Sequence, residues 1–158
     1  MLPTLQVPHP VPLSDHTFAV SSLFQLTVGT HDLGSFTSCE GLGCYTDVKT
    51  HSEGGLNNHV WQLPTRLLYT NIIFSRPLTR QTTLLWLWLN QVNQPHMPAL
   101  RLPGQIIALG PDRRPLVRWI LDGIVPVRWN GPSFSTDQAQ VAHETLEIAH
   151  NGFLEVTT

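Results

Sequence analysis

Most of the chain after residue 18 consists of short segments in which apolar and polar residues alternate. Between residues 24 and 28, for example, three apolar side chains alternate with Gln25 and Thr27. Successive side chains of a β-strand point to opposite faces, so this period of two is typical of a strand with one buried face. The alternation predicts that the chain folds mainly into β-strands.

Glycine and proline residues mark the turns between these segments. Gly29 opens the turn after the first segment, and Pro111 suits the second position of a later turn. Gly41 and Gly43 suit a bulge or a bend. We expect about eight or nine strands, within residues 24–28, 33–39, 44–50, 60–63, 67–74, 105–109, 116–121, 125–129 and 141–149.

One segment instead has the period of an α-helix and runs from about residue 80 to residue 92. Thr79 precedes it and can accept a hydrogen bond from a free backbone N–H, and Pro95 ends it. Apolar residues recur there at i, i+3, i+4 and i+7, a stripe that must face a core. The stripe consists of Leu85, Trp88, Leu89 and Val92.

Further apolar residues of this helix, Leu84, Trp86 and Leu87, lie off the stripe. Burying them requires a second surface, so Trp86 and Leu87 are predicted to contact a neighbouring subunit. The composition agrees, because hydrophobic residues make up 41% and charged residues only 13% of the chain. This charged share is about half the usual value, and it indicates a surface largely covered in an assembly.

Together these segments predict a mainly β fold, a small two-sheet sandwich or an open barrel with one flanking α-helix. This domain is expected to span residues 16–158. Residues 1–15 form a proline-rich N-terminal arm that is unlike a strand or a helix. Such a segment is mobile unless a neighbour holds it, so Pro10 is predicted to contact an adjacent subunit.

Charge and hydropathy argue against nucleic-acid binding and membrane insertion. The net charge is -2, and the nearest basic cluster, Arg113, Arg114 and Arg118, falls in or beside a predicted turn. The longest strongly apolar run, residues 84–89, is far too short to cross a bilayer. The N-terminus also lacks the basic and then apolar order of a targeting segment. We therefore expect the protein to stay in the cytoplasm of the producing cell.

The most enzyme-like feature is the group His143, Glu147 and His150. On a helix these residues would share a face and could hold a metal, but the flanking turn residues favour a strand. On a strand His150 points away from the other two. No phosphate-binding glycine loop is present, and Ser133 lacks the context of a serine nucleophile. We predict no catalytic residue, no metal ligand and no cofactor.

The cysteines Cys39 and Cys44 allow three interpretations. Their spacing is not that of a zinc finger, and no second pair exists. Free buried thiols are the preferred interpretation, while a disulfide across the intervening glycine turn and a metal site stay open.

Several motifs, taken in order, resemble those of the tail tube proteins of contractile phage tails and extracellular contractile injection systems. The resemblance covers residues 18–154, and the order and spacing of the motifs carry it. The motifs lie at residues 36–42 (FTSCEGL), 53–58 (EGGLNN), 63–72 (LPTRLLYTNI), 84–88 (LLWLW), 126–129 (PVRW) and 144–153 (ETLEIAHNGF).

This resemblance implies a task without chemistry. Six copies of such a protein form a ring, and rings stack into a tube around a lumen, inside a contractile sheath. The implied partners are further copies of the chain, the sheath protein, baseplate or spike proteins, other tube paralogs, and cargo in the lumen. By similarity, residues 53–58 belong to an extended hairpin that reaches a neighbouring subunit or ring. The predicted contacts there are Glu53, Gly54, Gly55, Asn57 and Asn58.

The resemblance leaves two roles open. The chain is expected to be a main tube subunit, or alternatively a tube initiator that joins the tube to the baseplate. The long N-terminal arm and the doubled asparagine favour the second role. A metal-binding enzyme and a nucleic-acid-binding β module are more distant alternatives, the latter because Arg128 lies beside Trp129. The particle is expected in the producing cell or released from it.

Overall fold

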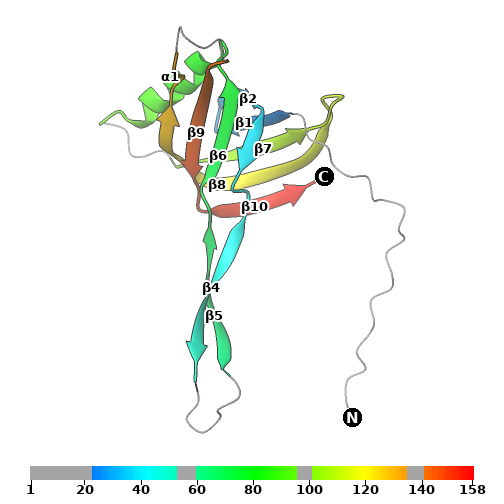
Figure 1. Ribbon diagram of the computed structural model, residues 1–158, viewed down its shortest axis with the longest axis vertical. Coiled ribbons are helices and arrows are strands. Elements are labelled where there is room, and N and C mark those ends of the chain that lie inside the picture. Colours follow the sequence, from blue (N-terminus) through cyan, green and yellow to red (C-terminus); the bar gives the residue numbers. More distant parts are fainter. Residues whose placement is uncertain (1–22, 53–59, 96–100, 135–140) are drawn as a thin grey trace.

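The computed structural model describes residues 23–52, 60–95, 101–134 and 141–158. These residues form ten β-strands and one α-helix, which confirms the mainly β fold class with a single flanking helix (Figure 1). The elements are β1 (Leu23–Val28), β2 (His31–Phe36), β3 (Ser38–Glu40), β4 (Cys44–His51), β5 (Trp61–Tyr69), β6 (Ile72–Pro77), α1 (Thr82–Val92), β7 (Leu102–Leu109), β8 (Pro115–Asn130), β9 (His143–Ala149) and β10 (Gly152–Thr157).

Eight of the strands form one curled sheet in which neighbouring strands are antiparallel. Its order is β2-β1-β7-β8-β9-β6-β3, with β10 also paired to β8. The end strands β2 and β3 are consecutive, and Thr37 between them donates its backbone N–H to Ser75 O on β6 at 2.9 Å. This bent segment links the two ends of the sheet, so the barrel form of the predicted fold is the one observed.

The longest strand, β8, runs through a bend. Its first part pairs with β7 and β10, and its last part pairs with β9. Gly123 lies at the bend with a φ of 61°, and a Cβ added there would lie 2.3 Å from Asn151 Nδ2. Glycine bends the backbone at this point without ending the pairing. The separate strands predicted at residues 116–121 and 125–129 are therefore one strand.

The hydrophobic core fills the inside of the curled sheet and the space beneath α1. Inward residues of the strands meet the apolar stripe of the helix there, as the two sequence periods predict. Phe36 and Phe74 pack against each other with ring centroids 5.0 Å apart. The buried members of the core are Leu26, Val28, Leu33, Phe36, Ile72, Phe74, Leu85, Trp88, Leu89, Ile106, Leu121, Ile124, Leu146 and Ile148.

The helix begins later than the sequence predicted and ends at Val92 as expected. Thr79 Oγ1 accepts a hydrogen bond from the Gln81 backbone N–H at 3.2 Å, before the helix rather than at its first turn. Gln81 occupies the N-cap position without capping through its side chain. Its Oε1 instead accepts the Ser35 backbone N–H at 3.2 Å, so a tertiary contact replaces the predicted cap.

Two predicted strand boundaries around Pro64 were wrong. The strand expected to end at residue 63 continues through Pro64 to Tyr69, and the strand expected across residues 67–74 is divided between β5 and β6. Pro64 lies opposite Val48 at a register irregularity. Proline lacks an N–H and is tolerated there, because a two-stranded sheet has free edges.

The break between β5 and β6 lies at Thr70. Its hydroxyl hydrogen-bonds to Gly41 O at 2.6 Å and to Gly43 O at 3.1 Å. These bonds attach Thr70 to the glycine turn between β3 and β4, where the pairing of β5 with β4 ends. The segment predicted as one strand at residues 33–39 is also divided, into β2 and β3, by the bend at Thr37. The strand β10 was not predicted, although Leu154 and Val156 belong to an alternating C-terminal segment.

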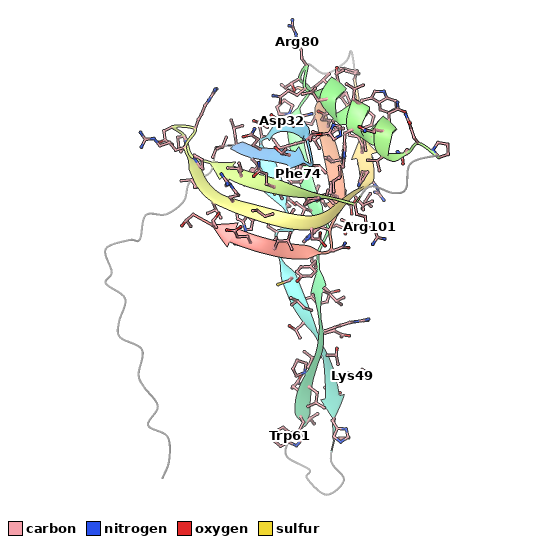
Figure 2. The ribbon with its side chains drawn as sticks, turned by 180° about the vertical axis from the view of Figure 1, so that it is seen from behind. Asp32, Lys49, Trp61, Phe74, Arg80 and Arg101 are labelled. Carbon is pink, nitrogen blue, oxygen red and sulfur yellow. The ribbon has the colours of Figure 1, made fainter. Side chains whose placement is uncertain are left out.

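Strands β4 and β5 form a separate two-stranded sheet that extends away from the barrel and is called the arm below. Figure 1 shows the arm and α1 at opposite ends of the long axis of the molecule. In Figure 2, Lys49 and Trp61 lie along the outer half of the arm, while Arg80, just before α1, marks the other end. The molecule therefore has two structurally different ends.

Candidate assembly surfaces

Both faces of the arm carry large apolar side chains that are open to solvent. In the antiparallel register Tyr45 lies opposite Leu68, and Lys49 lies opposite Leu63, so these residues share one face. Leu67 follows in the alternation and points to the other face. The exposed fraction is 56% for Tyr45 and 49% for both Leu63 and Leu67. The arm therefore has no buried face of its own.

The arm has weak internal stabilisation. Arg66 Nε lies 3.7 Å from Asp47 Oδ2, but both side chains are largely exposed, and Thr65 Oγ1 donates to Asp47 O at 2.9 Å. An exposed ion pair contributes about 1 kcal/mol or less, and an isolated two-stranded hairpin is marginal in water. The contacts within the arm therefore contribute little, and its attachment to the barrel supports it.

The root of the arm is fixed to the barrel at several points. Next to Thr70, Asn71 donates its side-chain N–H to Glu147 Oε1 on β9 at 2.8 Å. Gly152 lies against the ring of Tyr69, and a Cβ on this glycine would lie 2.9 Å from Tyr69 Cζ. The close approach of β10 to the last residue of β5 therefore requires glycine, and it sets the position of the arm.

Exposed apolar side chains also lie on α1, at Leu84, Trp86 and Leu87, and on β8, at Val127. These four residues are called the helix face below. The exposed fraction is 54% for Trp86 and 58% for Leu87, which lie off the buried stripe as the helical period predicted. Trp86 packs against Trp129 with ring centroids 5.9 Å apart. Beside this pair, α1 and β8 border a groove of about 270 Å³. The helix face thus combines exposed apolar side chains with a hollow.

A buried ion pair lies beneath α1. Arg76 Nε on β6 is 2.5 Å from Glu144 Oε1 on β9, and each side chain is 1% exposed. The Arg76 Nη1 also donates to Leu33 O at 2.8 Å, and the guanidinium lies 4.4 Å from the ring centroid of Phe36. Burying two charges is favourable only when hydrogen bonds satisfy them, and most of these bonds are present.

The carboxylate of this pair connects the helix to the barrel. Glu144 Oε1 accepts the hydroxyl of Thr82 at 2.9 Å, and Oε2 accepts the indole N–H of Trp129 at 3.2 Å. Thr82 begins α1, and Trp129 supports Trp86, so Glu144 positions the helix face. The sequence did not predict this role. The available signal was a charged residue, Arg76, at an inward position of a strand.

The structure does not support the metal-binding alternative built from His143, Glu147 and His150. His143 is exposed at the start of β9, Glu147 is bound by Asn71, and His150 follows the strand and packs against Tyr69. In the described segments, no group of at least three His, Cys, Asp or Glu residues is arranged to hold a metal ion.

Both cysteines are free thiols. Cys39 packs against the core, and burial, assisted by the charge of Glu40, raises the pKa of its thiol from 9.0 to about 12. Cys44 is exposed at the start of the arm. The disulfide interpretation is therefore wrong for this structure, and the two thiols differ greatly in their environment.

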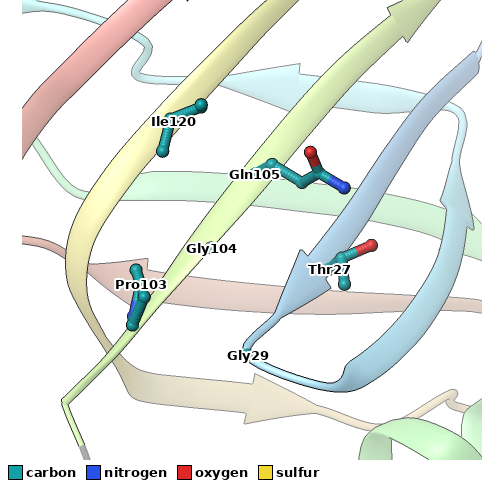
Figure 3. Close-up of a pocket in the computed structure, with 6 residues that line it drawn as sticks. All are labelled: Thr27, Gly29, Pro103, Gly104, Gln105 and Ile120. Atoms are coloured by element: carbon teal, nitrogen blue, oxygen red, sulfur yellow. The ribbon is translucent and has the colours of Figure 1, made fainter.

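A shallow pocket on the barrel offers little chemistry. Figure 3 shows its lining of Thr27, Gly29, Pro103, Gly104, Gln105 and Ile120, around a volume of about 200 Å³. None of these side chains titrates, so the pocket cannot supply a general acid or base. No helix in the described part of the chain is long and apolar enough to cross a membrane.

Some predicted contacts lie outside the described residues. These are Pro10 of the N-terminal arm, with residues 1–15, and the loop residues Glu53, Gly54, Gly55, Asn57 and Asn58. The described strands β4 and β5 flank that loop. Among the predicted contacts, the structure therefore places Trp86 and Leu87, both exposed on the helix face.

A curled β-barrel with a protruding arm and an apolar helix face defines a structural β protein suited to association with other chains. The chain belongs to the family of the T4-like virus tail tube protein gp19, whose family model matches residues 20–154. This match confirms the resemblance found in the sequence. The protein is a tail tube or tube-related component of phage tail-like contractile injection systems.

Solved structures share this fold at low sequence identity. A chain in the cryo-EM structure of the anti-feeding prophage (AFP) baseplate matches with a TM-score of 0.72 and 23% identity, covering 88% of this chain and 95% of that chain. A chain of the PVC sheath–tube complex in the extended state matches with a TM-score of 0.69 and 19% identity, covering 96% and 93%. A chain of the AFP tube-terminating cap matches with a TM-score of 0.69 and 19% identity, covering 98% of this chain and 95% of that chain. No curated protein sequence matches significantly.

Proposed function

We propose that the chain is a structural subunit of an inner tail tube, in which hexameric rings stack around a lumen that conducts cargo. The observation that carries this proposal is the placement of two different apolar surfaces, the arm and the helix face, at opposite ends of the molecule (Figure 1). Contact between two different surfaces on successive copies is heterologous and continues along an axis. The same contact would cover both exposed surfaces.

The helix-face residues Trp86 and Leu87 are the proposed inter-subunit contacts that the structure describes. Fully burying a large apolar side chain contributes about 1.5–3 kcal/mol, so a few such residues per copy contribute substantially when multiplied around a ring. Pro10 and the loop residues Glu53, Gly54, Gly55, Asn57 and Asn58 complete the proposed set. In this arrangement residues 1–15 act as a separate N-terminal segment, distinct from the β4–β5 arm, and residues 16–158 act as the tube domain.

The proposed partners are other copies of the chain, the sheath protein, baseplate or spike proteins, and other tube paralogs. The protein is proposed not to be an enzyme, because the described pockets lack a set of groups for acid–base or nucleophilic chemistry. Assembly is proposed to occur in the cytoplasm of the producing cell, which retains or releases the finished particle.

A tube initiator or baseplate adaptor is a second candidate function. The similarity to a chain in the AFP baseplate structure supports it. The two roles predict different behaviour of the purified protein. A main tube subunit elongates on its own into tubes, whereas an initiator stops at a single ring until other tube proteins are added.

Negative-stain electron microscopy of the purified protein tests the proposal. We expect rings or tubes of uniform width for the natural chain and for Leu63→Val, which keeps an apolar residue on the arm. Leu63→Asp places a charge on the contact surface and should leave single, folded copies. A natural chain that stays monomeric at all concentrations, with or without baseplate proteins, contradicts the proposed function.

A further inference from the structure

The groove between α1 and β8 combines two tryptophan rings with polar side chains. Trp86, Leu89 and Asn93 line it from α1, and because they recur at i, i+3 and i+7 they lie along one side of the helix. Residues 126–129 line it from β8. The rings of Trp86 and Trp129 lie with centroids 5.9 Å apart and planes tilted by 47°. We call this hollow the tryptophan groove.

The tryptophan groove has the two kinds of group that an extended proline-rich peptide needs. A polyproline II helix has no internal hydrogen bonds, so its backbone carbonyl groups need donors from outside. Its proline side chains pack well into grooves lined by aromatic rings. Besides the two tryptophans, the groove presents the guanidinium of Arg128 and the side-chain amide of Asn93, which are exposed and carry N–H donors.

Residues 5–13 (LQVPHPVPL) of the same chain have a matching pattern and are called the proline segment below. A polyproline II helix has three residues per turn, so side chains three positions apart form a row along it. The three rows are Leu5, Pro8 and Val11; Val7, Pro10 and Leu13; and Gln6, His9 and Pro12. Two rows are therefore wholly apolar, and the polar side chains are confined to the third.

Chain length favours the groove of another copy. The described chain begins at Leu23, which pairs with Leu109 on β7, and Leu109 pairs with Pro115 at the start of β8. Following β8 from Pro115 to the groove takes about eleven residues, or about 36 Å at 3.3 Å per residue. The chain from residue 13 to Leu23 spans at most about 33–36 Å. Reaching its own groove along the sheet would stretch this tether almost fully, at a large cost in conformational entropy.

We propose that the proline segment of one copy binds as a polyproline II helix in the tryptophan groove of a neighbouring copy. Its two apolar rows pack against Trp86 and Trp129, while Arg128 and Asn93 donate hydrogen bonds to its carbonyl groups. The third row faces solvent. The proposal rests on the proposed function, because assembly supplies the neighbouring copy.

This docking and the arm contact use different sides of α1. At 3.6 residues per turn, Leu84 and Leu87 lie on the far side of the helix from Leu89 and Asn93. Both leucines are exposed, at 45% and 58%. One copy can therefore hold a proline segment in its groove and an arm against the rest of its helix face.

Photo-crosslinking within the full-length protein tests the docking. Benzoylphenylalanine replaces Val11, in an apolar row, or His9, in the third row, as the matched control. Samples assembled from ¹⁵N-labelled and unlabelled copies are irradiated, and mass spectrometry identifies the joined peptides. We expect crosslinks from position 11 to residues 86–93 and 126–129, joining labelled to unlabelled peptides, with a yield several-fold above that from position 9.

Two proline substitutions then test the rows. Pro10→Ala removes a ring from an apolar row, so the yield from position 11 should fall several-fold. Pro12→Ala removes the same ring from the third row and should leave the yield unchanged. Equal yields for the two variants overturn the docking. Crosslinks confined to single copies, or directed to other surfaces such as the arm, overturn it as well.

Electron microscopy of the same samples separates the docking from the proposed function. Rings or tubes that lack these crosslinks contradict the docking alone. Crosslinks between copies in samples that hold neither rings nor tubes contradict the proposed function alone. Samples with neither crosslinks nor assemblies contradict both.

Discussion

Of the charged residues in the described segments, Arg76 and Glu144 are the two that are buried. Each is held by hydrogen bonds from several elements, so their main effect is positional: they connect β6, β9, β8 and the start of α1. A buried ion pair does not by itself make a fold more stable, because desolvation offsets the attraction. Removing one partner, however, leaves the other charge unpaired in the core.

We therefore expect Arg76→Met to lower the free energy of unfolding by about 3–5 kcal/mol. Arg66→Met is the matched control, because the exposed pair of Arg66 with Asp47 contributes about 1 kcal/mol or less. Urea denaturation followed by circular dichroism measures both values. If both substitutions lower the free energy of unfolding equally, burial of the pair between Arg76 and Glu144 does not determine its effect on stability.

The two thiols should react at very different rates. Burial raises the pKa of Cys39 to about 12, so at pH 8 roughly one thiol in ten thousand is the reactive thiolate. Iodoacetamide should therefore label the exposed Cys44 and leave Cys39 unmodified, and Cys44→Ser should remove all labelling of the native protein. Mass spectrometry of tryptic peptides measures this. Comparable labelling of both residues would contradict the raised pKa of the partly buried Cys39.

At the level of single elements, α1 has two apolar faces with different roles. Leu85 is fully buried in the core, while Leu87 is largely exposed on the helix face. Leu85→Ala should lower the free energy of unfolding by about 2–5 kcal/mol, because it leaves a cavity. Leu87→Ala should change it by less than about 0.5 kcal/mol.

The readout that separates these faces is assembly. Thermal unfolding monitors the stability of each variant, and sedimentation monitors rings and tubes. We expect Leu87→Ala to stay as stable as the natural chain and yet assemble less. If Leu87→Ala assembles normally, the helix face is not the contact surface.

Sequence periodicity predicted the individual strands and the helix better than it predicted which elements contact each other. The period of two in residues 24–28 and the stripe of α1 both report burial, which is a local property, and the structure confirms them. The bond between Arg76 and Glu144 joins residues 68 positions apart, so no local pattern could indicate it. Two strands were predicted where β8 is one, because a strand that bends, as β8 does at Gly123, and a strand that ends leave similar traces in sequence.

The arm also shows that local sequence patterns do not indicate which elements pair or what covers them. Strands β4 and β5 have strand-like sequences, and only their pairing separates them from the barrel strands. Their exposed side chains look like ordinary core residues until the structure shows that no described element covers them. Resemblance to the tail tube family suggested an extended hairpin, which periodicity alone could not.

For the whole molecule, a low charged share predicts how assembly responds to salt. The arm and the helix face both expose large apolar side chains, and the chain has a net charge of only -2. Raising NaCl from 0.1 M to about 1 M screens charges but does not weaken apolar contacts, and sulfate strengthens them. Tube formation followed by light scattering should therefore persist in NaCl and increase in sulfate. Dissolution by NaCl would indicate a contact made by charges.

The separation of the arm from α1 along the long axis also has a consequence for any column of stacked copies. If copies stack along this axis, every subunit points the same way, so one terminus of the column presents the β-hairpin arms and the other presents the end that carries α1. Growth at the two termini must then differ in rate, because different groups are added at each. For the same reason no single protein can stop both, and each terminus needs a terminator of its own shape.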